Sequence, residues 1–236
     1  MLTLGGAKFT IFIPPHSQSE LERYTTSLFD SWEAQVDKEL DRFPDYALYL
    51  DVEEGSLKGN GRIVAHLSKL AIAVGVYGGI VQGVQVINSQ VKVASECLKA
   101  KAVEPFADEV SSYTARASSG KLGRLERLFR KVEKNELDPE IAAFMAAKLF
   151  EEDAESCPQF VRDIFAAIQR LSPGSEQLNL MPDWHPEPVL PSIVDEKRSM
   201  QESDRPSRLP RENYRIEVWR ETKRQTRRMR IRWFRK

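Results

Sequence analysis

Two different periods of hydrophobic and polar positions run along this chain, and each predicts its own kind of element. Residues 8–13 alternate between apolar and polar side chains, which indicates a strand that ends before two consecutive prolines. Ser17, with Glu20 three residues later, predicts the capped start of a helix, and the helical period then continues to about Leu40. The chain is therefore expected to open with a strand followed by a long amphipathic helix.

A β-hairpin is predicted next. Residues 47–52 and 62–67 both read as strands, and the polar stretch 53–61 between them contains three glycines. Glycine readily adopts the positive φ angles that hairpin connections need. The carboxylates of Asp51, Glu53 and Glu54 are of the type that holds a divalent cation, but solvated turn side chains explain them better.

The stretch from Leu70 to Val91 contains no charged side chain, and it predicts a helix that runs unbroken from about residue 68 to about residue 103. Gly75, Gly79 and Gly83 recur at every fourth position within it. On one helix this spacing places the glycines along one edge, where another backbone can approach closely.

Three interpretations of this glycine-spaced helix stay open. It is a core helix packed inside its own chain, a contact surface between copies of the chain, or a membrane span with small residues at the contact. Gln82, Gln85, Asn88, Ser89 and Gln90 interrupt its second half and leave an apolar stretch of about a dozen residues, a length more typical of a buried core helix. The packing interpretations are therefore preferred to the membrane span.

Three shorter amphipathic helices are predicted after the polar residues 118–120. Each has one apolar stripe, and short connections between such helices favour a compact antiparallel bundle. The stripes are Leu122, Leu125, Leu128, Phe129 and Val132; Ile141, Phe144, Met145 and Leu149; and Val161, Ile164, Phe165, Ile168 and Leu171.

The remainder of the chain divides into a proline-rich arm and a basic end. Residues 173–211 contain seven prolines and little periodicity, which is typical of a linker or an extended arm. Residues 212–236 alternate again, so a basic β-hairpin is the preferred prediction and a cationic helix the alternative.

These elements predict a mainly helical α+β fold. It comprises a small β element, a long central glycine-spaced helix, a three-helix bundle, and a Pro-rich arm that ends in a basic β-hairpin. The expected divisions are 1–117 for the hairpin and apolar helix, 118–172 for the bundle, 173–211 for the arm and 212–236 for the basic hairpin.

Composition adds a separation of charge that the total conceals. The chain has 35 Lys and Arg and 35 Asp and Glu, yet residues 205–236 contain thirteen basic side chains against three acidic ones. The preceding residues therefore carry a matching acidic excess. A basic tail on an acidic body implies an anionic partner for the tail.

The tail offers cations for binding an anionic partner and aromatic rings for further contacts. Such a combination suits phosphate contacts and base stacking in RNA or DNA. Docking onto an acidic protein surface, in the same or another subunit, is the preferred interpretation, with RNA or DNA next and an anionic membrane third. The candidate cations are Lys223, Arg224, Arg227, Arg228, Arg230 and Arg232, and the candidate aromatic contacts are Trp219, Trp233 and Phe234.

Candidate chemistry is sparse. The three histidines are scattered, and the two cysteines, Cys97 and Cys157, form no CxxC pair. No catalytic motif, metal site or cofactor is predicted. Free cysteines and an N-terminus without a signal-peptide pattern favour the cytoplasm, with association at the inner membrane as the alternative.

Two stretches carry a resemblance. Residues 51–58, Asp-Val-Glu-Glu-Gly-Ser-Leu-Lys, lead into residues 76–83, Val-Tyr-Gly-Gly-Ile-Val-Gln-Gly. Together they resemble a pattern in small uncharacterised bacterial proteins associated with phage-defence and mobile-element gene neighbourhoods. The resemblance implies a subunit or effector rather than a metabolic enzyme, and no site residues follow from it.

The sequence thus favours a non-enzymatic interaction subunit that self-associates or joins a larger complex. Its basic C-terminal arm, residues 205–236, would grip a partner protein, RNA or DNA. The alternative is a membrane-perturbing effector whose glycine-spaced helix inserts and oligomerises.

Overall fold

A computed structural model describes residues 1–12, 17–54, 56–106, 112–152, 154–171 and 213–234. Its centre is one six-stranded antiparallel sheet with the strand order β4-β1-β3-β2-β5-β6. The strands are β1 Leu2–Ile11, β2 Ala47–Glu53, β3 Leu57–Ala65, β4 Tyr113–Ser118, β5 Asn213–Arg220 and β6 Arg228–Phe234.

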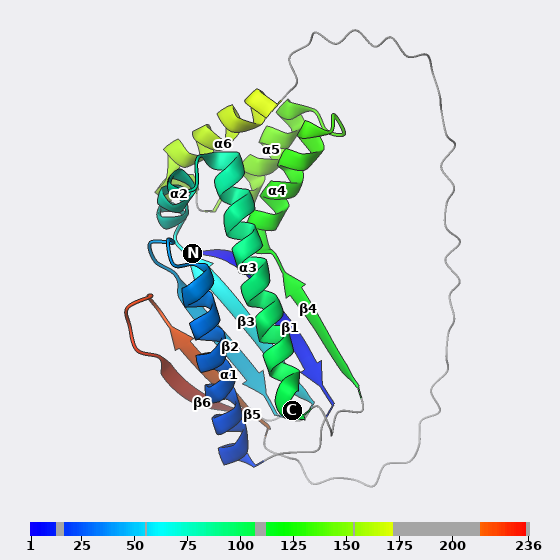
Figure 1. Ribbon diagram of the computed structural model, residues 1–236, viewed down its shortest axis with the longest axis vertical. Coiled ribbons are helices and arrows are strands. Elements are labelled where there is room, and N and C mark those ends of the chain that lie inside the picture. The colour runs from blue at the N-terminus through cyan, green and yellow to red at the C-terminus, as the bar shows by residue number, and fades with distance from the viewer. Residues whose placement is uncertain (13–16, 55, 107–111, 153, 172–212, 235–236) are drawn as a thin grey trace, which may run out of the picture.

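Two long helices, α1 (Gln18–Glu39) and α3 (Ile80–Val103), lie side by side over one face of the sheet (Figure 1). The short helix α2 (Leu67–Val76) and the helices α4 (Gly120–Glu133), α5 (Pro139–Phe150) and α6 (Pro158–Leu171) gather at one end of the molecule. Two 3-10 turns, Glu104–Phe106 and Ala154–Ser156, complete the described elements. The fold is α+β and mainly helical, as the sequence predicts.

One continuous cluster of buried apolar side chains links the sheet, the two long helices and the three C-terminal helices. Trp32 of α1 is fully buried beneath the helix layer, and Phe29 meets it edge to face with ring centroids 6.3 Å apart. The segments 1–117 and 118–172, predicted from the sequence as separate divisions, therefore share one core.

The start of α1 follows the predicted capping box. The Ser17 hydroxyl accepts a hydrogen bond from the Glu20 backbone N–H, and the Glu20 carboxylate accepts one from the Ser17 N–H at 2.9 Å. These two bonds satisfy helix donors that otherwise lack partners.

Two glycines that the sequence assigned to the hairpin turn lie instead inside β3. Added Cβ atoms would fall 1.9 Å from the Phe9 ring at Gly59 and 2.2 Å from the Leu98 side chain at Gly61. These glycines leave space for core side chains and are not needed for positive φ angles. Only residues 54–56 separate β2 from β3.

The prediction of a single helix through residues 68–103 is wrong. The chain bends by 105° between α2 and α3, and Gly79 occupies the bend with φ 114°, a conformation that favours glycine. Gly75, Gly79 and Gly83 therefore do not share one helix edge. Gly83 alone of the three packs closely, because a Cβ there would lie 2.7 Å from the Val74 carbonyl oxygen.

The predicted apolar stripe of α5 faces outward except at Leu149, which is half-buried and packs against the core. Ile141, Phe144 and Met145 are 53%, 71% and 46% exposed, whereas Ala142 and Ala146 are fully buried. Apolar residues occur on almost every side of this helix, and the small alanine face allows the closer approach to α4 and α6. The larger side chains are left at the surface.

Strand β4 was not predicted, and it pairs with β1 at one edge of the sheet. The C-terminal basic hairpin is confirmed as β5 and β6, but it is not a separate element, because β5 pairs directly with β2. The Pro-rich arm at residues 173–211 lies outside the described residues.

Candidate nucleic-acid interface

The face of the sheet opposite α1 and α3 carries polar and charged side chains, and we call it the open face. Strand side chains alternate between faces, and directly paired residues share a face. Three rows cross it from β4 to β6: Ser118, Gly6, Arg62, Tyr49, Trp219, Arg228; Arg116, Lys8, Asn60, Asp51, Glu217, Arg230; and Thr114, Thr10, Lys58, Glu53, Arg215, Arg232.

The open face has a large excess of positive charge. Its acidic side chains are Asp51, Glu53 and Glu217. Its basic side chains are Lys8, Lys58, Arg62, Arg116, Arg215, Arg228, Arg230 and Arg232. The opposite balance holds on α1, which covers the other face and carries six Asp and Glu against two Lys and Arg.

Two pairs of like charges lie directly opposite each other across neighbouring strands. Lys8 faces Arg116 in the β1–β4 pair, and Arg215 faces Arg232 in the β5–β6 pair. Like charges in this position destabilise a sheet. For Lys8 and Arg116, which no described carboxylate neutralises, the arrangement costs stability in the free protein, and a bound polyanion would relieve it.

The two sides of the open face differ in how far their cations are neutralised. Near β5 and β6, Glu217 pairs with Arg230 at 2.6 Å and with Arg232 at 3.1 Å, and Glu53 pairs with Arg215. On β1, β3 and β4 the cations Lys8, Lys58 and Arg116 are exposed, and no ion pair with another described residue involves them. The strongest uncompensated charge therefore lies along β1, β3 and β4.

Two aromatic rings lie between these basic margins. Tyr49 on β2 and Trp219 on β5 are directly paired, half-buried neighbours. The Arg62 guanidinium lies 5.7 Å from the centre of the Tyr49 ring, and that of Arg230 lies 5.5 Å from the Trp219 ring. Each ring thus offers a face to a planar group.

The acidic side chains sit within this basic surface rather than apart from it. Burial raises the pKa of Asp51, Arg62 at 3.6 Å opposes this rise, and Glu217 on the paired strand adds to it. Asp51 and Glu217 face each other directly, so this spot repels a second negative charge.

The structure separates the predicted tail residues into three groups. Arg228, Arg230, Arg232 and Trp219 lie on the open face, as their alternation predicts. Trp233 lies on the opposite face against Tyr214, with ring centroids 5.3 Å apart. The backbone of Phe234 belongs to β6, and its side chain lies outside what the structure describes.

The remaining tail cations lie in the turn between β5 and β6. The Lys223 ammonium donates to the Leu40 and Asp41 carbonyl oxygens at 3.1 and 2.8 Å. It therefore holds the hairpin to the end of α1 and is not directed at an outside partner. Arg227 pairs with Asp30 of α1, while Arg224 is exposed.

A buried arginine anchors the hairpin to α1. Arg220, only 4% exposed, donates two hydrogen bonds to Asp37, at 3.0 and 2.7 Å, and pairs with Glu33 at 2.8 Å. Burial acts to raise the pKa of Asp37, but the hydrogen bonds from Arg220 and Tyr46 outweigh it and hold this pKa below its usual value. The acidic body thus binds part of the basic tail within the same chain.

Sequence reasoning missed the open-face residues that precede the tail. The available signal was the alternation of polar positions in the first three strands, which places Lys8, Lys58, Arg62 and Tyr49 on the faces opposite their apolar neighbours. Their assembly with the tail residues required the strand order, which alternation does not supply.

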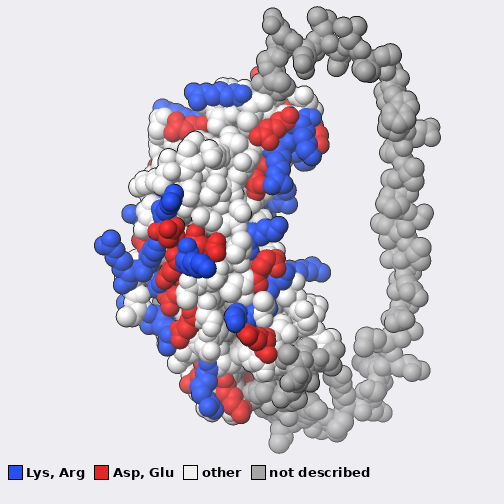
Figure 2. Space-filling model, viewed as in Figure 1, with Lys and Arg blue, Asp and Glu red and all other residues white. Residues whose placement is uncertain are grey.

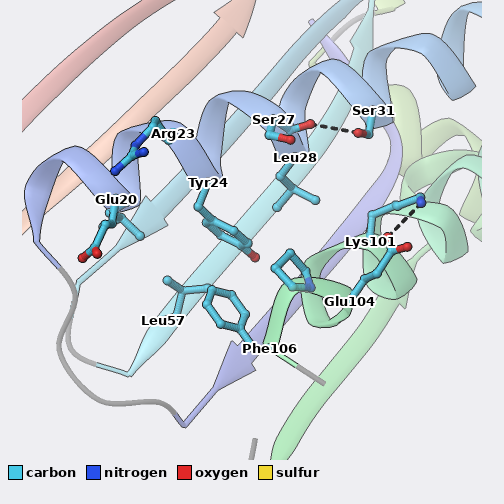
Figure 3. A pocket seen from close by; sticks show the side chains of 12 residues that line it. Glu20, Arg23, Tyr24, Ser27, Leu28, Ser31, Leu57, Lys101, Glu104 and Phe106 are labelled. Atoms are coloured by element: carbon cyan, nitrogen blue, oxygen red, sulfur yellow. Dashed lines mark hydrogen bonds and ion pairs between the residues drawn. The ribbon is translucent and has the colours of Figure 1, made fainter. Parts of the chain in front are cut away.

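A cavity of about 340 Å³ lies on the helix side, between α1 and the end of α3 (Figure 3). Tyr24 and Leu28 point toward Phe106 and Leu57, and the Tyr24 hydroxyl donates to the Ala102 carbonyl at 2.9 Å. Burial raises the pKa of Tyr24 far above its usual value, so this hydroxyl stays protonated. The Tyr24 ring also lies 5.1 Å from the Phe106 ring, so these contacts hold α1 to the end of α3 beside the cavity.

The helix side of the molecule is charged along α1 and largely uncharged over α2 and the start of α3 (Figure 2). Ile72 and Val76 of α2 are each 55% exposed there. Within the described ranges, no single helix has the length and apolar character to cross a membrane; α2 and Ile80–Phe106 meet the criteria only as a bent pair. The described residues also contain no cluster of three or more potential metal-ligating side chains.

No protein-family profile, curated protein or solved structure matches this chain.

Proposed function

We propose that this protein is a non-enzymatic, nucleic-acid-binding subunit that works as part of a larger assembly in the cytoplasm. The observation that carries the proposal is the open face, where cations from five strands gather and two pairs of them are placed directly against each other. Neutralising phosphates with such cations releases counterions, which supplies most of the affinity of sequence-independent nucleic-acid binding.

The interface differs from a free basic tail. Lys8, Lys58 and Arg116, far from the C-terminus in sequence, contribute its least neutralised charge. Deleting the tail would remove β5 and β6 from the sheet and expose the edge of β2. Point substitutions therefore test the proposal better than a truncation.

The decisive experiment measures binding of the full chain to mixed-sequence RNA and DNA oligonucleotides as a function of salt. Replacing Lys8 and Arg116 together by Gln should weaken binding at least ~10-fold at low salt and reduce the log–log salt slope by roughly 0.7 per lost phosphate contact on a single strand. Lys38→Gln on α1 removes one exposed charge from the helix side and is the control for charge loss away from the open face, expected to leave binding unchanged.

A gain-of-binding variant excludes simple structural damage as an explanation. Glu217→Gln removes a negative charge from the open face and frees Arg230 and Arg232 from their ion pairs. Tighter binding is expected. An absence of binding at ~50 mM salt by the wild-type chain, or equal losses in the Lys38 control, would refute the proposal.

The assembly part of the proposal rests on α5. Its outward Ile141, Phe144 and Met145 form an apolar surface, and contiguous exposed apolar surface marks interaction sites. Phe144→Glu should convert a larger species to monomer in light scattering coupled to gel filtration. A wild-type chain that is monomeric at every concentration and recovers no partner from its host would contradict this part.

The membrane-perturbing effector stays as the second candidate, because Ile72 and Val76 present apolar side chains at an uncharged corner. Dye release from anionic liposomes tests it. Release by the purified chain that Ile72→Asp abolishes would favour the effector over the nucleic-acid subunit.

A further inference from the structure

We infer that the open face binds single-stranded nucleic acid and stacks unpaired bases on Tyr49 and Trp219. This inference rests on the proposed function and adds to it the kind of nucleic acid. The supporting observation is the position of the two rings within the register. They are directly paired on the adjacent strands β2 and β5, the fourth and fifth of the six strands, with basic side chains on both sides.

The spacing of the sheet sets the dimensions of the interface. Neighbouring strands lie ~4.8 Å apart, so the cations of β1 and of β6 are separated by roughly 19 Å, with the aromatic pair between them. Directly opposite side chains have Cβ atoms ~5 Å apart. Two rings at this separation can each accept one of two consecutive bases while the backbone reaches cations on either side.

The guanidinium contacts mark the ring faces as stacking positions. Arg62 and Arg230 lie 5.7 and 5.5 Å from the ring centres, and their side chains are 47% and 52% exposed. Arginine and nucleobases both stack as planar groups on aromatic rings. An incoming base would take the place of each guanidinium, and the arginine would exchange its ion pair with Asp51 or Glu217 for one with a phosphate.

A duplex cannot use these rings. Its bases are stacked on one another and present only their edges in the grooves, so it would contact the open face through phosphates alone. Single-stranded bases expose their flat faces, and stacking on protein aromatic rings tolerates any sequence. The open face should therefore prefer single strands without a strong base preference.

The acidic row next to the rings fits the same arrangement. Asp51 lies two residues after Tyr49, and Glu217 lies two residues before Trp219, so each carboxylate is ~7 Å along the strand from its ring. Phosphates close to these carboxylates would be repelled. Bases rather than the sugar–phosphate backbone are therefore expected over the centre of the sheet, and phosphates over its margins.

The test compares three probes of equal length with the full chain: a mixed-sequence single strand, its duplex, and an abasic strand with the same phosphates. Wild type should bind the single strand at least ~5-fold more tightly than the abasic strand for each ring engaged, and more tightly than the duplex. Tyr49→Ala and Trp219→Ala should remove this advantage and leave abasic-strand binding unchanged. Tyr49→Phe and Trp219→Phe keep a ring at each position and should retain most of it.

The outcomes separate the two proposals. Equal binding of all three probes, with alanine variants that behave as wild type, would overturn base stacking while the charge variants still support nucleic-acid binding. Binding of none of the probes would refute the proposed function itself. Because both rings are only half-buried, circular dichroism should show folded alanine variants, which keeps a loss of stacking distinct from unfolding.

Discussion

At the scale of single residues, Arg220 shows how a charged side chain becomes part of a fold. It is buried between the hairpin and α1, its guanidinium binds Asp37 through both terminal nitrogens, and it lies 5.4 Å from the centre of the Tyr46 ring. Two parallel hydrogen bonds between charged groups fix direction as well as distance. Arg220 therefore determines how the hairpin sits against the helix.

Replacing Arg220 by Ala should lower the free energy of unfolding by about 2–3 kcal/mol, because hydrogen bonds between charged groups and the packing of the side chain are both lost. Urea denaturation measures the change. Arg227→Ala is the matched control, since the exposed pair of Arg227 with Asp30 should contribute less than ~1 kcal/mol. Equal losses in both variants would contradict the anchoring role of Arg220.

The same contact predicts how stability depends on pH. The pKa of Asp37 is lowered in the folded state, so its contribution to stability is complete above the ordinary aspartate pKa of ~3.9 and is lost as the pH falls through the lowered value. Asp37→Asn should therefore flatten the loss of stability below pH ~4 in urea titrations.

Glu33 contributes with the opposite sign. Burial raises its pKa, Arg220 at 2.8 Å opposes this rise, and the nearby carboxylates of Asp37 and Asp30 add to it. The contribution of Glu33 is present below the ordinary glutamate pKa of ~4.3 and is lost as the pH rises through the raised value. In Glu33→Gln, the free energy of unfolding should consequently fall more steeply as the pH is lowered. A shallower fall than in the wild type would contradict this assignment.

At the scale of elements, the break between α2 and α3 gives three regularly spaced glycines three different environments. Gly83 touches the backbone of Val74 closely, Gly79 provides the positive φ angle of the bend, and Gly75 faces open space. The regular spacing in the sequence does not correspond to a common contact.

A pair of alanine substitutions tests this arrangement. Gly83→Ala should destabilise the protein by about 1–3 kcal/mol, because the new methyl group forces the α2 backbone away. Gly75→Ala should instead stabilise it by roughly 0.5–1 kcal/mol, since a helical glycine with free space gains from a side chain. Thermal unfolding of both variants gives the comparison, and destabilisation of similar size at both positions would restore the shared-edge interpretation.

The elements also show what sequence periodicity resolves. The capped start of α1, the β2–β3 hairpin, the α4 and α6 stripes and the C-terminal hairpin were all predicted, because each depends on contacts close in sequence. The outward face of α5 was not, since the burial of Ala142 and Ala146 depends on how closely other helices approach. The bend at Gly79 was missed because a helical glycine and a helix-ending glycine look alike in sequence.

At the scale of the whole molecule, the basic tail predicted from the sequence divides into two groups of cations. Part of the tail is neutralised within the chain, by Asp30, Glu33 and Asp37 of α1. The rest joins cations of the N-terminal strands on the open face. Alternation predicted the face of Arg228, Arg230 and Arg232, but the sheet order that brings them to Tyr49 is a long-range property.

The shared sheet predicts the result of a truncation. A chain that ends at residue 212 lacks β5 and β6, so β2 becomes an edge strand whose apolar Leu50 and Val52 lose their strand neighbours. Long apolar edges pair with other chains. The truncated chain should elute as aggregates in gel filtration, and a soluble monomer would show that the hairpin is dispensable for the sheet.

The pairing of β2 with β5 has a consequence for how the chain is made. Glu53 and Arg215, partners in this ladder, are separated by 162 residues. A ribosome adds residues at ~5–20 per second, so a newly made β2 waits on the order of ten seconds for its neighbour. During that interval the nascent chain exposes an unpaired edge. Chaperone contact or slow elongation should therefore affect the yield of this protein more than its final stability.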